Sequence, residues 1–156
     1  IRDTSVTGVQ TCALPIYNED TTKALPHIRQ SLENLKPVLD DHIGTIFGLE
    51  VPLYSNHLGV AGRCDCIAQY NGVPSIIDFK TSRYKKKKEK ISNYFAQGAA
   101  YSIMWEERTG MVVPNIVIIM DVDHEKPSVF VEHRDNWTDL LHNTIDEYRK
   151  RKMFGH

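Results

Sequence analysis

Two aspartates, Asp65 and Asp78, lie on either side of a predicted turn in the middle of the chain. The turn, Asn-Gly at residues 71–72, separates two runs rich in apolar residues, which is the strongest short-range signal for a two-residue β-hairpin. If Tyr70 and Val73 flank the turn, the numbers of paired residues sum to 143, and Asp65 lies directly opposite Asp78. The two Cβ atoms would then be about 4.5–5.5 Å apart, which is repulsive unless a cation or a proton lies between the carboxylates.

The same register places Arg63 opposite Lys80, and all four side chains project from one side of the sheet. Hard oxygen ligands of this kind suit Mg²⁺ or Mn²⁺, which commonly bind one or two protein carboxylates together with a substrate phosphate. An ordinary salt-bridged strand face is the competing interpretation, because an aspartate two residues before a lysine is common.

Other polar residues in the chain favour the metal interpretation. Glu50 lies on the preceding predicted strand, and Gln97 and Tyr101 are four apart on one face of a predicted helix. Three further polar residues, on a strand before the hairpin and on a helix after it, are therefore candidates for the same site.

The periodicity of the sequence predicts the elements that position these residues. Apolar residues recur at helical spacing over residues 19–35 and predict an amphipathic helix that ends near Pro37. Alternation over residues 47–54 predicts a half-buried strand, in which Pro52 indicates a sheet edge or a bulge. Residues 58–70 and 73–82 form the predicted hairpin.

The second half of the chain continues with a helix over residues 92–107, a buried strand over residues 117–122, a short strand over residues 129–132 and a final helix that ends in a basic segment. This order predicts an α/β fold in which helices flank a mixed sheet.

Four motifs together resemble the PD-(D/E)xK nuclease superfamily. They are a glutamate on a strand, G-x-x-D at residues 62–65, D-x-K at residues 78–80 and Q-x-x-x-Y at residues 97–101. The similarity covers residues 25–148 and is strongest to RecB-like exonucleases, including the mitochondrial genome maintenance exonuclease and related phage exonucleases. It implies a restriction-endonuclease-like fold with a mixed central β-sheet flanked by α-helices.

The resemblance also implies roles for individual residues. The implied catalytic residues are Asp65, Asp78, Lys80 and, less firmly, Glu50, and the implied ligands of Mg²⁺ or Mn²⁺ are Asp65, Asp78 and Phe79. The implied DNA-binding or site-supporting residues are Gln97, Tyr101, Arg63, Arg83, Lys85, Lys86, Lys87 and Lys88.

The chain departs from the RecB-like pattern at one point. These nucleases carry a metal-binding histidine on an upstream helix, and neither His27 nor His42 has a matching sequence context. Some relatives hold an iron–sulfur cluster, but only Cys64 and Cys66 lie in the domain, and we interpret this Cys-x-Cys on one strand face as packing.

A dense basic segment, residues 83–90, directly follows the predicted lysine. Such runs are usually solvated loops, but here the segment adjoins the predicted site and is suited to contacts with phosphates. Tyr84 and Tyr94 could stack on unpaired bases, although Tyr94 is equally suited to the core.

The composition sets the remaining bounds. With 156 residues and 25% charged residues, the chain has room for about one domain of an ordinary globular protein. The net charge of −1 gives no overall electrostatic attraction to nucleic acid, and three cysteines do not make a disulfide framework. No apolar run reaches the roughly 18 residues of a membrane span.

Residues 6–16, VTGVQTCALPI, read as a translated sequencing adapter, so we interpret residues 1–16 as non-native and residues 17–156 as an N-terminally truncated nuclease domain. We expect that the histidine-bearing helix was lost with the native N-terminus. The expected setting is the cytoplasm of a bacterial or phage-infected cell, or the mitochondrion if the source is eukaryotic.

The expected function is Mg²⁺-dependent hydrolysis of DNA by an exonuclease that prefers single strands or ends. A catalytically inactive nucleic-acid-binding domain of the same fold and a restriction-type endonuclease are the alternatives.

Overall fold

The computed structural model describes residues 26–155, without the side chains of residues 26–29, 31 and 32. The interpretation of residues 1–16 as adapter-derived and the domain start at residue 17 lie outside the described residues. In chain order the elements are α2 (Pro26–His42), β1 (Ile43–Ser55), β2 (Val60–Tyr70), β3 (Val73–Ser82), η1 (Lys88–Lys90), α3 (Ser92–Thr109), β4 (Asn115–Val122), β5 (Ser128–His133), η2 (Arg134–Asn136) and α4 (Thr138–Met153).

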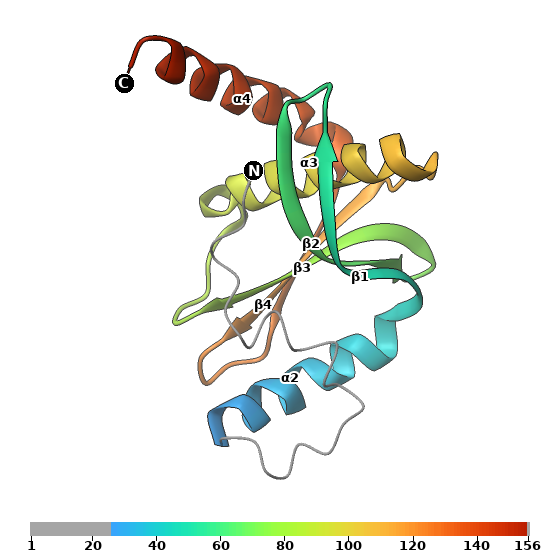
Figure 1. Cartoon of the computed structure of the whole chain (residues 1–156). Helices are drawn as coiled ribbons and strands as arrows, with labels where there is room; N and C mark the ends of the chain where they lie inside the picture. Colours follow the sequence, from blue (N-terminus) through green and yellow to red (C-terminus); the bar gives the residue numbers. More distant parts are fainter. Residues whose placement is uncertain (1–25, 156) are drawn as a thin grey trace.

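The five strands form one sheet in the order β1-β2-β3-β4-β5. β3 and β4 are parallel and are connected through α3, whereas the other neighbours are antiparallel. Helix α2 lies on one side of the sheet, and α3 and α4 lie on the other (Figure 1). The predicted α/β fold with a mixed sheet flanked by helices is therefore confirmed.

The β2–β3 hairpin has the predicted register, with Tyr70 paired to Val73 and Cys66 paired to Ile77. Asn71 and Gly72 have φ angles of 50° and 80°, as a type I′ turn requires. The turn chemistry therefore determines the register, because only residues that tolerate positive φ form a two-residue link between twisted strands.

Two apolar clusters hold the layers together. One lies between the sheet and α3 with α4, and the second lies between the sheet and α2. Gly98 brings α3 close to β4, because a Cβ at this position would overlap Cγ2 of Ile116. Within residues 26–155, no helix combines the length and apolar character needed to cross a membrane.

Helix α2 does not end near Pro37 as predicted but continues to His42. Proline inside a helix removes one hydrogen bond and costs roughly 3 kcal/mol. Leu35 and Leu39, one turn apart, are both buried in the cluster beneath the sheet, whereas Pro37 is exposed. Burial of the two leucines on the same face offsets the cost and keeps both turns helical.

Candidate active site

β2 separates from β3 at Asp65. The described ladder between these strands ends at the pair Cys66–Ile77. Next to this last pair, the amide N–H of Phe79 on β3 donates to Oδ2 of Asp65 on β2 over 2.9 Å. A side chain thus accepts a main-chain hydrogen bond at the end of the ladder. The strands open into a fork at this point, with Asp65 at its base.

Asp65 and Asp78 meet inside the fork, as the register predicts. Both are buried, with 7% and 3% of their surface exposed. Burial, the charge of Asp78 and hydrogen bonding to Asp78 together raise the pKa of Asp65 to about 9, against the lowering effects of the Phe79 amide and Lys80. In the metal-free protein a proton therefore separates the two carboxylates.

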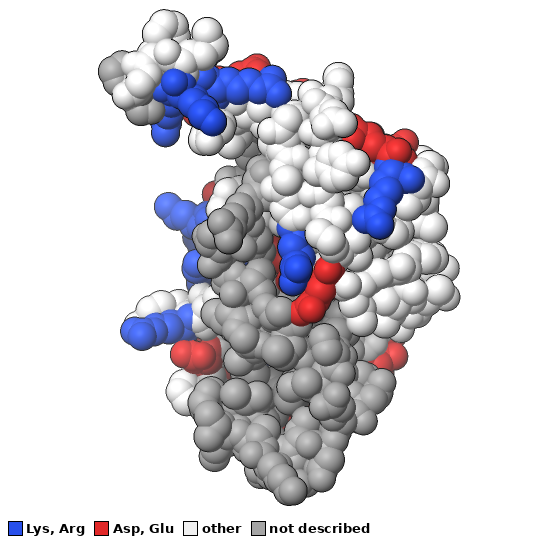
Figure 2. Space-filling view, viewed as in Figure 1, with Lys and Arg blue, Asp and Glu red and all other residues white. Residues whose placement is uncertain are grey.

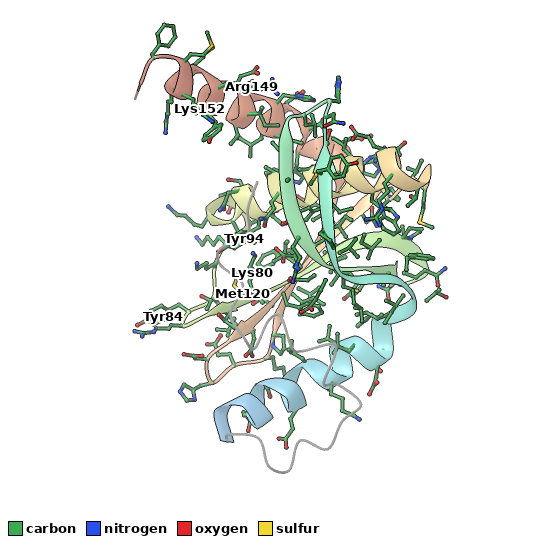
Figure 3. The ribbon with its side chains drawn as sticks, in the orientation of Figure 1. Lys80, Tyr84, Tyr94, Met120, Arg149 and Lys152 are labelled. Carbon is green, nitrogen blue, oxygen red and sulfur yellow. The ribbon has the colours of Figure 1, made fainter. Side chains whose placement is uncertain are left out.

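Lys80 is the buried cation of the fork. It is only 2% exposed, its Nζ lies 3.1 Å from Oδ2 of Asp78, and Nζ is 4.7 Å from the centroid of the Tyr94 ring. An ammonium group is rarely buried to this extent unless it is paired, and the carboxylate and the ring face supply its partners. Figure 3 shows Lys80 and Tyr94 together on one side of the molecule.

The prediction that Arg63 lies opposite Lys80 is wrong. Arg63 pairs with Pro52 of β1 and is exposed, whereas Lys80 is buried. The physical reason is the fork. The part of β2 before Cys66 pairs with β1 and no longer pairs with β3. A uniform hairpin register cannot anticipate that separation.

The same departure corrects the interpretation of the two cysteines. Cys64 and Cys66 are both fully buried, in agreement with a packing role, but they belong to the clusters on opposite sides of the sheet. The strand therefore loses its simple alternation around Asp65. Burial and the charges of Asp78 and Asp65 raise the pKa of the Cys64 thiol, which keeps it protonated beside the fork.

Glu50 lies on β1 between the residues that pair with Cys64 and Cys66, and so at the level of Asp65. Its φ of 49° interrupts the extended strand. Among the described residues Glu50 makes no hydrogen bond or ion pair, and it is not among the charges that shift the pKa of Asp65. The structure brings Glu50 to the edge of the fork without joining it to the carboxylate pair.

Gln97 and Tyr101 are buried on α3, with 7% and 1% of their surface exposed. Tyr94 precedes Gln97 by three residues, so the three side chains form one stripe on the helix, and the Tyr94 ring at its start contacts Lys80. Sequence reasoning did not identify the contact between Tyr94 and Lys80. The helical spacing from Tyr94 to Gln97 was the available signal.

The basic segment, residues 83–90, is exposed along its whole length. Lys85 and Lys88 form ion pairs with Glu125 and Glu132 over 3.6 Å and 2.9 Å. Arg83, Lys86 and Lys87 form no ion pair with any residue that the structure describes, which leaves their charges available to a ligand. Tyr84 is 77% exposed beside them.

His42 lies away from the fork, as its sequence context predicts. It stacks on Tyr70 with ring centroids 5.1 Å apart, and its Nδ1 is 2.7 Å from Oδ1 of Asn71 at the hairpin turn. The side chain of His27 is outside the described part of the structure.

The fork has the donor chemistry of a divalent-metal site. Two carboxylates that are close enough to share a proton are the hard oxygen ligands that Mg²⁺ and Mn²⁺ prefer, and the ion would replace that proton. Phe79 has only its main-chain carbonyl oxygen to offer, since its ring is buried in the cluster beneath the sheet. Within the described residues, no group of three or more His, Cys, Asp or Glu side chains gathers for a metal.

The comparison with protein families identifies the class to which this fold and fork belong. Residues 9–153 match the model of the PD-(D/E)XK nuclease superfamily, and the chain belongs to that superfamily. No curated protein matches the chain in sequence.

Two solved structures show how far the fold resembles known proteins. A candidate exonuclease from Eubacterium rectale superposes with a TM-score of 0.51 at 14% identity, covering 94% of this chain. This chain spans 66% of the length of that protein. The structure of SSO0001, with a TM-score of 0.40 at 14% identity over 87% of this chain and 70% of that one, is too distant to support an argument.

Proposed function

We propose that this protein is a divalent-metal-dependent DNA exonuclease of the RecB-like branch that prefers single strands or free ends. The observation that carries the proposal is the buried pair Asp65 and Asp78 with Lys80 ion-paired beside them. A purely structural role for this arrangement is unfavourable, because the two acidic side chains are buried side by side and the raised pKa of Asp65 means that one of them takes up a proton.

Each residue of the fork has a chemical role in this proposal. Asp65 and Asp78 hold Mg²⁺ or Mn²⁺, which when bound supplies charge stabilisation to the phosphoryl oxygens and lowers the pKa of a water molecule. Lys80 orients the attacking water and offsets developing charge with its ammonium group. Tyr94 holds Lys80 in place through its ring face.

The stripe on α3 supports the assignment to the exonuclease branch. Gln97 and Tyr101 lie on the same face of α3 as Tyr94, whose ring contacts Lys80. They match the Q-x-x-x-Y motif of RecB-like enzymes. The exposed Arg83, Lys86 and Lys87 follow Lys80 along the chain and offer contacts to the phosphates of an adjacent strand.

The test is release of nucleotides from end-labelled single-stranded DNA by the full chain in Mg²⁺, with EDTA as the metal-free control. We expect Asp78→Ala and Lys80→Ala to abolish release. Asp121→Ala is the matched control. Asp121 is also buried, but it follows Met120, whose side chain lies in the α3-side cluster, so the Asp121 side chain faces the opposite side of the sheet. The control should lose stability but keep cleavage.

Circular and linear DNA distinguish the alternatives. An exonuclease degrades linear single strands and leaves circular single strands intact. Cleavage of circles would instead identify a restriction-type endonuclease. DNA binding without any Mg²⁺-dependent cleavage would identify a non-catalytic binding domain and contradict the proposal.

A further inference from the structure

A hollow lies between the tip of the β1–β2 hairpin and α4, apart from the fork. It has a volume of about 600 Å³ and is lined by Gly59, Val60, Ala61, Thr144, Ile145, Tyr148, Arg149 and Lys152. One guanidinium nitrogen of Arg149 donates to the carbonyl oxygen of Leu58 over 2.6 Å. This bond ties α4 to the hairpin tip and fixes the two walls relative to each other.

The lining of this hollow has the chemistry of a nucleotide site. Tyr148 is 64% exposed and offers a ring face, and Arg149 and Lys152 provide two positive charges without an acidic residue in the lining. Aromatic rings stack on unpaired bases of any sequence, and Lys and Arg contact the phosphates that join them.

A second hollow of about 680 Å³ provides an internal comparison. It is lined in part by Tyr54 and Arg108, but also by Glu107, whose charge cancels that of the arginine. Tyr54 is 69% exposed, close to the value for Tyr148. The two hollows therefore match in size and in their exposed tyrosine but differ in net charge, and only the first one favours a polyanion.

The helix dipole accounts for only part of this pattern. Basic residues in the last turn of a helix are stabilising, and this explains the charges of Lys150, Arg151 and Lys152 in α4. It does not explain an exposed tyrosine one turn before Lys152, beside a hollow that also contains Arg149.

The hollow lies on the same side of the molecule as the fork. In Figure 3, Arg149 and Lys152, then Tyr94 and Lys80, and finally Tyr84 follow one another along this side, from α4 to the segment after β3. Figure 2, in the same view, shows Lys and Arg side chains over the end of α4 and again below it on this side. The fork thus lies between two basic regions.

We propose that the hollow between the hairpin tip and α4 binds a nucleotide of the substrate strand, with its base against Tyr148 and its phosphate at Lys152, while the strand continues past Lys80 toward residues 83–90. The inference rests on the proposed function for the nature of the substrate. It adds that the substrate enters as a single strand, because only an unpaired base can stack on Tyr148.

The test uses fluorescence anisotropy of labelled single-stranded oligonucleotides in EDTA, where binding is measured without cleavage. For a 20-mer, Tyr148→Ala and Lys152→Glu should each raise Kd by about tenfold. Tyr54→Ala and Arg108→Glu, in the comparison hollow, should change Kd less than twofold. Arg149 is left intact because its loss would release the hairpin tip.

Two further readouts separate the inference from the proposed function. Metal-dependent hydrolysis of bis-p-nitrophenyl phosphate, which is too small to reach the hollow, should be the same in Tyr148→Ala as in the wild type. DNA with 5-iododeoxyuridine should cross-link on irradiation to a peptide that contains Tyr148.

Wild-type affinity in both hollow variants, or no cross-link to Tyr148, would overturn the inference even if the protein cleaves DNA. Weakened binding in the variants with no cleavage by the wild type would support the strand-binding hollow and contradict the proposed function.

Discussion

Two of the contacts of Lys80, the ion pair with Asp78 and the ring of Tyr94, act on it in different ways. The carboxylate of Asp78 supplies a negative charge, and the Tyr94 ring turns its electron-rich face to the ammonium group, with its centroid 4.7 Å from Nζ. Cation–π contacts of a desolvated ammonium contribute about 2 kcal/mol. The orientation of the amine in the fork therefore depends on an aromatic residue from another element.

We expect Tyr94→Phe to retain kcat within about twofold, because phenylalanine keeps a ring face over Lys80. Tyr94→Leu removes that face and should lower kcat by about tenfold, the rate equivalent of 1.4 kcal/mol. Single-turnover kinetics on labelled DNA measure both values. Equal rates for the leucine and phenylalanine variants would contradict a positioning role.

Asp65 gives the metal-free protein a characteristic pH dependence. Its pKa is raised to about 9 in the folded protein, whereas the unfolded chain ionises near 3.8. Unfolding between these values releases a proton, so the stability that this group contributes is complete below pH 3.8 and falls as the pH rises toward 9. In EDTA, the Tm should therefore fall between pH 5 and pH 8.

Asp65→Asn should remove much of this dependence and raise the Tm at pH 8 by on the order of 5 °C, because the amide oxygen still accepts the Phe79 hydrogen bond and carries no charge. Thermal unfolding with and without EDTA is the measurement, and Asp121→Asn is the control. Mg²⁺ or Mn²⁺ should raise the Tm of the wild type but not that of Asp65→Asn. A lower Tm for Asp65→Asn at pH 8 would contradict the shared-proton description of the pair.

The sequence predicted that Asp65 and Asp78 meet, but it did not predict the contact between Tyr94 and Lys80 beside them. Asp65 and Asp78 are located by the turn at residues 71–72, since a two-residue turn determines the register of everything near it. Tyr94 reaches Lys80 through the packing of α3 on the sheet, and the helical spacing from Tyr94 to Gln97 places Tyr94 on the right helix face without identifying Lys80 as its partner. The roles of Gln97 and Tyr101 remain predictions from the motif.

At the scale of elements, the strands and helices with strong local patterns were predictable and their irregularities were not. The predicted helix over residues 92–107 corresponds to α3 (Ser92–Thr109), which ends at Gly110 in the left-handed conformation. The continuation of α2 through Pro37 depends on the burial of its leucines against the sheet. The separation of β2 from β3 accompanies the pairing of β2 with β1. Local periodicity contains no information on which partner prevails.

Helix α3 connects stability with the candidate site through Gly98. Alanine at this position would force its Cβ against Ile116 and shift the helix that carries Tyr94 and Gln97. We expect Gly98→Ala to cost about 1–3 kcal/mol and to lower cleavage as well. Denaturant unfolding and cleavage rates measure the two effects.

The cause is tested by a double-mutant cycle with Ile116→Ala, which removes the overlapping methyl group. The double variant should be more stable than the sum of the single effects by at least 0.5 kcal/mol. Strict additivity would show that the close approach of α3 to β4 does not limit the size of residue 98.

For the whole molecule, charge distribution matters more than total charge. The chain has a net charge of −1, so any attraction to DNA must come from local groups. Residues 83–90 contain both paired and unpaired cations, since Lys85 and Lys88 contact Glu125 and Glu132. Glu125 and Glu132 thus distinguish two lysines that have acidic partners, Lys85 and Lys88, from the lysines between them.

We expect Lys86→Gln with Lys87→Gln to weaken binding of single-stranded DNA and to reduce the slope of log Kd against log salt by about 1.4, or 0.7 for each lost phosphate contact. Lys85→Gln with Lys88→Gln removes the same charge from positions with acidic partners and should change the slope less. Titrations at several salt concentrations measure both. Equal slopes for the two double variants would show that the ion pairs do not withhold Lys85 and Lys88 from DNA.

The fork has a practical consequence for trapping a substrate complex. Asp65 lies where the β2–β3 ladder ends and also belongs to the carboxylate pair, so truncating it would disturb the end of the ladder and the proposed metal ligands at once. Any altered affinity of such a variant would combine two causes. A non-cleaving protein for crystallisation with DNA is better made by Lys80→Met, which removes the ion-pair partner of Asp78 but keeps both acidic side chains and the hydrogen bond from Phe79 to Asp65.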